Sequence, residues 1–239
     1  MYNLMVCPHD TVRSAEGWYR TVQYLNDKLG LDLHFELAMD FAEFHANLAK
    51  ADLAYLNPKD CYTLRKNSGF VPVLRPTDTY DETLIVAGAD DASSTLSSLA
   101  GAKIATIPTM LQSKLGLKLL SSHGVAPGEM VACDSWLGVV RSVWGGDAPY
   151  GMIYRDAYEE LSPQGKGMVR VLATSDEQIA FHCISVGPKL ADKQDAIAAA
   201  FLAMPNDPLG KEVLADIHLP GWIAVSDAEL DKMAALIEA

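Results

Sequence analysis

The sequence predicts an α/β protein in which two mainly parallel sheets are flanked by helices, and three observations support this class. Short apolar runs alternate with longer segments of helical apolar spacing, as in strand–helix–strand crossover units. A polar stretch, Arg75-Pro-Thr-Asp78, separates two such series. With 239 residues, of which 49% are hydrophobic and 21% are charged, the chain can bury a sizeable core.

The first series of elements opens near the N-terminus. We expect strands at 3–7, 32–37 and 52–56 and helices at 14–29 and 40–50. In the first helix, four apolar residues recur at helical spacing, so this face should pack on the sheet: Trp18, Val22, Leu25 and Leu29.

The run from Asp52 to Tyr62 is the most informative part of this series, because a buried strand ends there in polar residues at a helix start. Asn57 is a favourable cap, Pro58 fits the first helical turn, and Asp60 suits the positive end of the helix. Backbone N–H groups beside Tyr55 then lie beyond the carboxyl end of the strand, where open α/β sheets bind ligands. This run therefore predicts a binding site.

The second series follows the polar stretch. We expect strands at 83–88, near 130, at 150–155, 168–174 and 179–186, and helices from 109, at 135–144, 189–204, 210–217 and 227–237. No internal repeat or low-complexity tract interrupts the two series.

Charge and hydropathy exclude several classes of function. The formal net charge of −12, without clusters of Lys and Arg, argues against a nucleic-acid surface or an anionic membrane patch. A small anionic ligand stays compatible, because helix N-termini can hold an oxyanion in an acidic protein. No apolar run reaches the roughly 18 residues that span a bilayer, and no signal peptide precedes the first strand.

The four cysteines, Cys7, Cys61, Cys133 and Cys183, show no Cys-x-x-Cys spacing, which excludes a zinc ribbon and a thioredoxin motif. Three interpretations stay open: buried inert thiols, one disulfide, or a ligand role for a cysteine near the predicted site.

Segments spread along the chain carry a family resemblance by their order and spacing: Cys7 to Asp10, Asp40 to Phe44, Asp52 to Tyr62, Gly69 to Pro76, Tyr80 to Thr83, Leu99 to Ala105, Gly146 to Ile153 and Asp207 to Leu214. With them, nearly the whole chain resembles the periplasmic solute-binding proteins of phosphate, phosphite and phosphonate ABC importers. The resemblance implies a two-lobed type II periplasmic-binding-protein fold. Lobe 1 would comprise 1–78 plus 184–239 and lobe 2 would comprise 84–179, joined by hinge crossovers at 79–83 and 180–183, with ligand between the lobes.

The resemblance also implies site residues. Tyr55 and Asn57 match the ligand loop of the first lobe, and Tyr80 matches a tyrosine of the crossover that lines the cleft. The alternatives are that Asn57 only caps its helix and that Tyr80 is an ordinary turn residue.

In the second lobe, Thr109 is expected to cap a helix and to offer its hydroxyl and the following amides to an oxyanion. The family carries several Ser and Thr residues at this point, whereas Met110 and Leu111 follow here, which favours a ligand with fewer anionic oxygens. Ser135 is a good cap for another helix. Trp136 could roof the cleft or pack in the core, and Tyr150 is expected to fill part of the pocket.

Two histidines occur near the predicted edge of the first lobe. His9 follows the first strand and His182 lies on the expected return crossover. Each could be a hydrogen-bonded structural residue. If both point inward with Cys7 or Cys61, their N and S atoms would suit Zn, Cu or a trivalent metalloid. We assign no metal site and no cofactor from the sequence.

The prediction is a solute-binding protein, not an enzyme, that captures a small oxyanion for an ABC permease. Serine-hydrolase, zinc-protease, Walker and Rossmann motifs are absent from the sequence. The resemblance favours a periplasmic location for a mature chain, and the sequence is also compatible with the cytoplasm. One alternative is a sensor that binds arsenite or a metal through Cys61 and signals to a membrane kinase. A less favoured one is an enzyme similar to menaquinone-pathway dehydratases.

Overall fold

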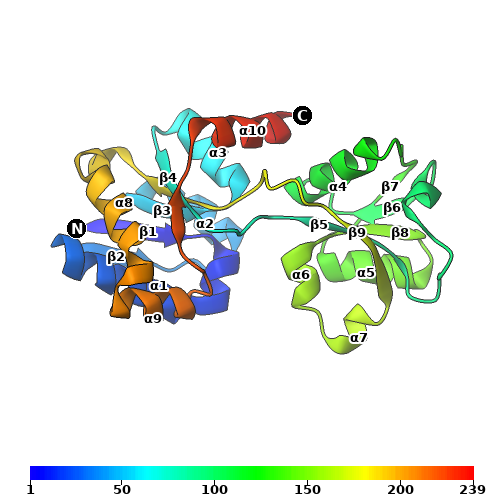
Figure 1. The fold of residues 1–239 in the computed structure, drawn as a ribbon, viewed down its shortest axis with the longest axis horizontal. Helices are drawn as coiled ribbons and strands as arrows, with labels where there is room; N and C mark the ends of the chain where they lie inside the picture. The colour runs from blue at the N-terminus through cyan, green and yellow to red at the C-terminus, as the bar shows by residue number, and fades with distance from the viewer. The chain divides into compact units, whose positions relative to one another are not determined.

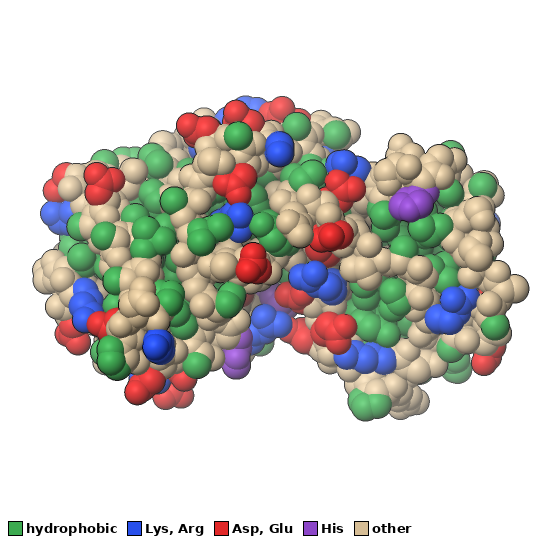
Figure 2. All heavy atoms as spheres, viewed as in Figure 1, with side chains coloured by type: hydrophobic (Ala, Val, Ile, Leu, Met, Phe, Trp, Pro, Cys, Tyr) green, Lys and Arg blue, Asp and Glu red, His purple; other side chains and the backbone are tan.

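The computed structural model describes residues 1–239 and has the expected α/β fold, with two sheets in two compact units (Figure 1). Unit 1 comprises Met1–Thr79 and Phe181–Met233, and unit 2 comprises Tyr80–Ala180 and Ala234–Ala239. None of the helices combines the length and the hydropathy needed to cross a membrane. On the face shown in Figure 2, Lys and Arg side chains lie scattered among Asp and Glu side chains.

The sheet of unit 1 has the strand order β11-β4-β10-β3-β1-β2. Its strands are β1 (Tyr2–Val6), β2 (Leu33–Glu36), β3 (Leu53–Leu56), β4 (Val71–Pro76), β10 (Cys183–Val186) and β11 (Trp222–Ala224). β1 pairs in parallel with β2 and β3, whereas β10 is antiparallel to both β3 and β4. A strand from late in the chain therefore lies between two early ones.

The helices of unit 1 pack around this sheet: α1 (Pro8–Leu29), α2 (Phe41–Asn47), α3 (Pro58–Asn67), α8 (Gln194–Ala203), α9 (Pro208–Asp216) and the start of α10 (Asp227–Glu238), with 3-10 turns η1 (Leu48–Lys50), η3 (Pro188–Lys193) and η4 (Met204–Asn206). α1 begins six residues before the predicted start at Ser14, and Ser14 itself has non-helical angles, φ −157° and ψ 70°. The predicted start therefore coincides with a kink that sets a short first turn apart from the long packed segment.

The sheet of unit 2 has the order β7-β6-β8-β5-β9. Its elements are β5 (Thr83–Gly88), β6 (Ile104–Thr106), β7 (Met130–Ala132), β8 (Tyr150–Tyr154), β9 (Val169–Thr174), α4 (Leu111–Ser122), α5 (Trp136–Gly145), α6 (Arg155–Glu159), α7 (Pro163–Lys166) and the 3-10 turn η2 (Leu96–Leu99). Alternate residues of β5 enter two different cores: Leu84 packs in the cluster that contains Val139 of α5, and Ile85 packs in the one that contains Leu120 of α4. Both faces of this sheet are thus covered, as its continuous apolar strands require.

Residues 234–239 belong to unit 2, whereas the sequence-based division placed the whole of 184–239 in lobe 1. The apolar side chain of Leu236 packs with Leu115 and Ala180, and Lys114 Nζ donates a hydrogen bond of 2.5 Å to the carbonyl of Ile237. Burial of an apolar side chain in the last helix accounts for the difference, which the amphipathic pattern of that helix did not specify.

Candidate functional site

In unit 1, the ends of three neighbouring strands meet at one edge of the sheet. Cys7 follows β1, Asn57 follows β3, and His182 precedes the antiparallel β10. The register pairs Val6 with Tyr55 and Leu56 with Cys183, so these three residues share the carboxyl edge of β1 and β3. Open α/β sheets bind ligands at such an edge.

The first turn of α1 brings a carboxylate to this edge. Asp10 Oδ2 lies 3.2 Å from Nδ1 of His182, and the two side chains are only 14% and 12% exposed. Burial raises the pKa of the Asp10 carboxyl, but the charge and hydrogen bonding of His182 more than offset this, so that the pKa lies below its usual value. Burial and the charge of Asp10 raise the pKa of the Cys7 thiol well above its usual value.

Asn57 caps α3 as predicted. Its Oδ1 accepts a 2.9 Å hydrogen bond from the backbone N–H of Asp60, and its Nδ2 donates to Asp60 Oδ2 at 2.6 Å. The same Nδ2 lies 3.9 Å from Cys7 Sγ. Asp60 also contacts Nε2 of His45 at 3.0 Å. Asn57 thus joins the starts of α1 and α3, and contact between Asn57 and a ligand stays a prediction.

Tyr55 lies in the core of unit 1. Its ring is 1% exposed and its centroid is 4.8 Å from that of Trp18, 5.2 Å from that of His182 and 5.8 Å from that of Trp222. A strand whose four residues are all buried explains this placement. The predicted contact of the Tyr55 hydroxyl with a ligand is untested.

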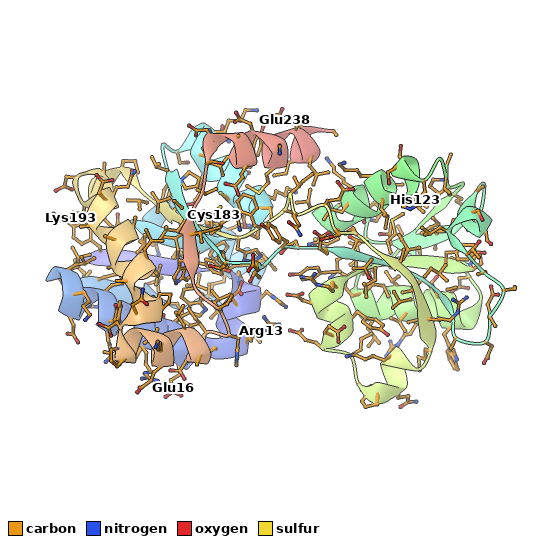
Figure 3. All side chains as sticks on the ribbon, viewed as in Figure 1. Arg13, Glu16, His123, Cys183, Lys193 and Glu238 are labelled. Atoms are coloured by element: carbon orange, nitrogen blue, oxygen red, sulfur yellow. The ribbon has the colours of Figure 1, made fainter.

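The structure separates the two remaining candidates of unit 1. His9 is the second residue of α1 and is partly buried near Asp10, whose carboxylate its charge stabilises. Cys61 is 1% exposed, lies 3.9 Å from the hydroxyl of Ser185, and interacts with the thiol of Cys183, labelled in Figure 3. All four cysteines are free. The thiol that approaches His182 is therefore Cys7, whereas α3 turns Cys61 into the core, and a ligand role for Cys61 stays a prediction.

In unit 2, β6, β7 and β8 run in parallel, and α4, α5 and α6 begin at their common carboxyl edge. The predicted cap at Thr109 is wrong, because α4 begins at Leu111 and its N-cap, Met110, makes no side-chain cap. A turn in which the N–H of Met110 donates to the carbonyl of Ile107 at 3.0 Å delays the helix. Thr109 is exposed, and no acidic residue occupies the first turn of α4.

Ser135 caps α5, as predicted, by accepting a 3.1 Å hydrogen bond from the N–H of Gly138. Trp136 is half-buried, and its ring centroid lies 6.4 Å from that of Tyr154 at the end of β8. The first turn of α5, like that of α4, holds no acidic residue. The structure thus brings Ser135 and Trp136 to the same edge of the sheet as Thr109.

Tyr150 lies at the opposite edge of the sheet, and its expected role in a ligand pocket stays a prediction. It is the first residue of β8 and pairs with Ile104, the first residue of β6. Its hydroxyl bonds the Ser94 hydroxyl at 2.9 Å and the side chain is 6% exposed. The residues that reach the carboxyl edge are Tyr154 and Arg155, which sequence reasoning missed; counting along the strand from Tyr150 would have indicated them.

The approach to β5 carries Tyr80, Asp81 and Glu82. Arg155 Nη2 donates to the carbonyl of Tyr80 at 2.7 Å, and Tyr80 is half-buried. Asp81 accepts hydrogen bonds from Tyr154 at 3.2 Å and from Gln112 at 3.3 Å. Glu82 accepts from the hydroxyl of Ser175 and from the N–H of Gln178. The two carboxylates are thus held in separate networks, and the ligand role of Tyr80 stays a prediction.

Comparisons with known structures identify the fold. The fold is that of type II periplasmic binding proteins. XAC2383 from Xanthomonas citri, bound to chloride, matches with a TM-score of 0.76 at 15% identity, over 99% of this chain and 97% of that one. PhnD1 from Prochlorococcus marinus, in complex with methylphosphonate, matches with a TM-score of 0.74 at 9% identity, over 98% and 96%. The aliphatic sulphonate binding protein SsuA from Escherichia coli matches with a TM-score of 0.70 at 14% identity, over 99% and 90%.

The family follows from the sequence itself. Residues 4–230 match the model of the phosphonate ABC transporter periplasmic substrate-binding proteins, and the chain belongs to this family. No curated protein matches the chain.

Proposed function

We propose that this protein captures a small oxyanion that carries a short organic group, such as an alkylphosphonate or an alkylsulfonate, and delivers it to an ABC permease in the periplasm. Capture needs no covalent chemistry. Membership of the substrate-binding family supports the transport role, and the chemistry of the solute is argued from the carboxyl edge of unit 2.

One observation carries the proposal: α4 and α5 begin at the same sheet edge and neither has an acidic residue in its first turn. A helix start offers N–H groups and the positive end of the helix dipole to an anion. The hydroxyls of Thr109 and Ser135 and the guanidinium of Arg155 belong to the same edge. By contrast, α1 and α3 of unit 1 carry Asp10 and Asp60 in their first turns, which disfavours an anion there. At the edge of unit 2, only α6 carries an acidic residue in its first turn, Asp156, whose Oδ1 lies 3.6 Å from Nε of Arg155.

Two apolar side chains accompany these polar groups. Met110, the N-cap of α4, is 42% exposed, and Leu137, the second residue of α5, is 40% exposed. An inorganic oxyanion would leave both in water, whereas an alkyl group could cover them. The anions bound by the PhnD1 and XAC2383 structures, methylphosphonate and chloride, agree with an anionic solute.

Isothermal titration calorimetry with methylphosphonate, methanesulfonate, phosphate and phosphite tests the proposal. We expect the alkyl oxyanions to bind more tightly than phosphate. Ser135→Ala should weaken that binding about fivefold to tenfold, since one hydrogen bond contributes about 1 kcal/mol. Ser162→Ala is the matched control, because Ser162 caps α7 by the same bond to an N–H, that of Gly165 at 3.2 Å.

The two substitutions should cost similar stability, and only Ser135→Ala should weaken binding. Equal loss of affinity in both variants, or absence of binding by all four anions, would overturn the proposal.

A further inference from the structure

We propose that Cys7, Asp10 and His182 form a binding site for a borderline-soft divalent cation such as Zn²⁺. The three residues come from the end of β1, the first turn of α1 and the residue before β10, and the topology of unit 1 brings them together. Their candidate ligand atoms, Cys7 Sγ, an Asp10 carboxylate oxygen and a His182 ring nitrogen, all lie within 4.8 Å of one another.

The spacing of these atoms suits tetrahedral coordination. Zinc bonds of about 2.0 Å to N and O and about 2.3 Å to S imply edges between neighbouring ligands of about 3.3 to 3.6 Å. The edge between Asp10 Oδ2 and His182 Nδ1 is already 3.2 Å. The candidate atoms lie within 4.8 Å of one another, so the thiol needs to approach the other two ligands by at most about 1.3 Å, which a change of side-chain torsion supplies.

The donor set is selective for such an ion. Thiolate and imidazole favour Zn²⁺ and related transition metals, whereas Mg²⁺ and Ca²⁺ prefer oxygen alone. The formal charges of one thiolate and one carboxylate would balance the two charges of the cation. That balance matters because Cys7 is 1% exposed and the other two side chains are nearly buried.

Neighbouring groups would orient the ligands. Asn57 Nδ2 lies 3.9 Å from Cys7 Sγ and is itself fixed by its bond to Asp60. The His182 ring packs against Tyr55, with centroids 5.2 Å apart. Such outer partners hold metal ligands in place. Asp10 and His182 keep some exposure, so solvent can reach the site, and three protein ligands leave the fourth tetrahedral position to water or another small ligand.

This site differs from the proposed oxyanion site. The oxyanion is assigned to helix starts of unit 2, whereas all three metal ligands belong to unit 1. The calorimetry above is performed in the presence of a chelator, so that its outcome is independent of metal, and the metal test contains no oxyanion solute.

Titration of the full-length protein with Co²⁺, in the presence of a phosphine reductant, tests the inference. Binding should produce a sulfur-to-cobalt charge-transfer band in the near ultraviolet, and Zn²⁺ should abolish it by displacement. Cys7→Ser should remove the band and weaken binding at least about 100-fold, more than loss of an outer partner usually does. Cys61→Ser is the matched control, because Cys61 is an equally buried thiol.

A second variant keeps the test decisive if Cys7→Ser does not fold. The triple variant Cys61→Ser/Cys133→Ser/Cys183→Ser leaves Cys7 as its only cysteine and should keep the band. His182→Gln removes the imidazole ligand, so it should weaken Co²⁺ binding while the sulfur-to-cobalt band is still present at saturation. Absence of a sulfur-to-cobalt band in the wild-type protein, or a band that disappears in the triple variant, would overturn the inference.

Discussion

Arg75 of β4 and Glu229 of α10 form an ion pair inside unit 1. Nη2 and Nε of Arg75 lie 2.8 and 2.9 Å from Oε1 of Glu229, and the Arg75 side chain is 8% exposed. The guanidinium also lies over the ring of Phe181, 5.3 Å from its centroid. This pair ties the start of α10 to the sheet.

Glu229→Gln should lower the free energy of unfolding by about 1–3 kcal/mol, because it leaves a buried guanidinium without its counter-charge while Glu229 itself stays partly solvated. Urea unfolding followed by circular dichroism measures the change. Asp227→Asn is the control, since the Asp227 side chain is 90% exposed beside Arg65 and its loss should change stability very little. Equal effects of the two substitutions would contradict the importance of the buried pair.

The same pair predicts a pH dependence. Burial raises the pKa of Glu229, but hydrogen bonds from Ser226 and the pairing with Arg75 outweigh it, so the pKa lies below the usual value. A lowered pKa in the folded state stabilises the protein above the unfolded pKa of about 4.3, and this contribution is lost as the pH falls through the folded value. The stability difference between wild type and Glu229→Gln should therefore be constant near neutral pH and should shrink below about pH 4. A difference independent of pH down to full acid unfolding would refute this.

Gly151 of β8 allows α5 to pack closely on the sheet. A Cβ atom at this position would lie 2.8 Å from Val139 Cγ1 and 3.0 Å from Val143 Cγ2. Gly151→Ala should therefore destabilise the protein by about 1–3 kcal/mol through overpacking. Gly88→Ala in β5 is the matched control, because no heavy atom lies within 4 Å of its added Cβ. Thermal unfolding of both variants measures the difference in stability. Similar melting temperatures would contradict the prediction and show that α5 can shift without cost.

Two substitutions of Tyr55 distinguish a packing role of this residue from a ligand-binding role. Tyr55→Ala should cost about 3–5 kcal/mol, as expected for deletion of a buried aromatic ring. Tyr55→Phe keeps the ring against Trp18 and His182 and removes only the hydroxyl. If the predicted contact with solute exists, calorimetry should show weaker binding by folded Tyr55→Phe; unchanged affinity would assign Tyr55 to the core alone.

The fold class could be predicted from the sequence because alternation of apolar runs and helical patterns depends on local periodicity. The caps at Asn57 and Ser135 could be predicted for the same reason, since a cap is a contact between residues three apart. The predicted cap at Thr109 was wrong because a turn at Ile107 to Met110 makes α4 begin two residues later. The sequence pattern of such a turn is weaker than that of a helix cap.

The rest of the site depends on distant parts of the chain. The Asp10 to His182 contact joins residues that come together only because β10 lies beside β3. Sequence spacing suggested His9 in place of Asp10 and favoured Cys61 as the ligand thiol, with Cys7 as an alternative to it only beside the two histidines. Only the helical phase of α3, which turns Cys61 toward Ser185, distinguishes the two thiols.

The place of β10 also has a consequence for the order of folding. Residues 80–180 supply the whole sheet of unit 2 and are synthesised without interruption by residues of unit 1. In unit 1, β10 (Cys183–Val186) pairs with both β3 and β4, so these two strands cannot be linked in the sheet until β10 has been synthesised. Until then, both strands have an unpaired edge, and contacts of such long sequence separation form slowly. We therefore expect the nascent chain to be most prone to aggregation through these two edges, and the sheet of unit 1, although its first strand is made first, to be completed after the sheet of unit 2.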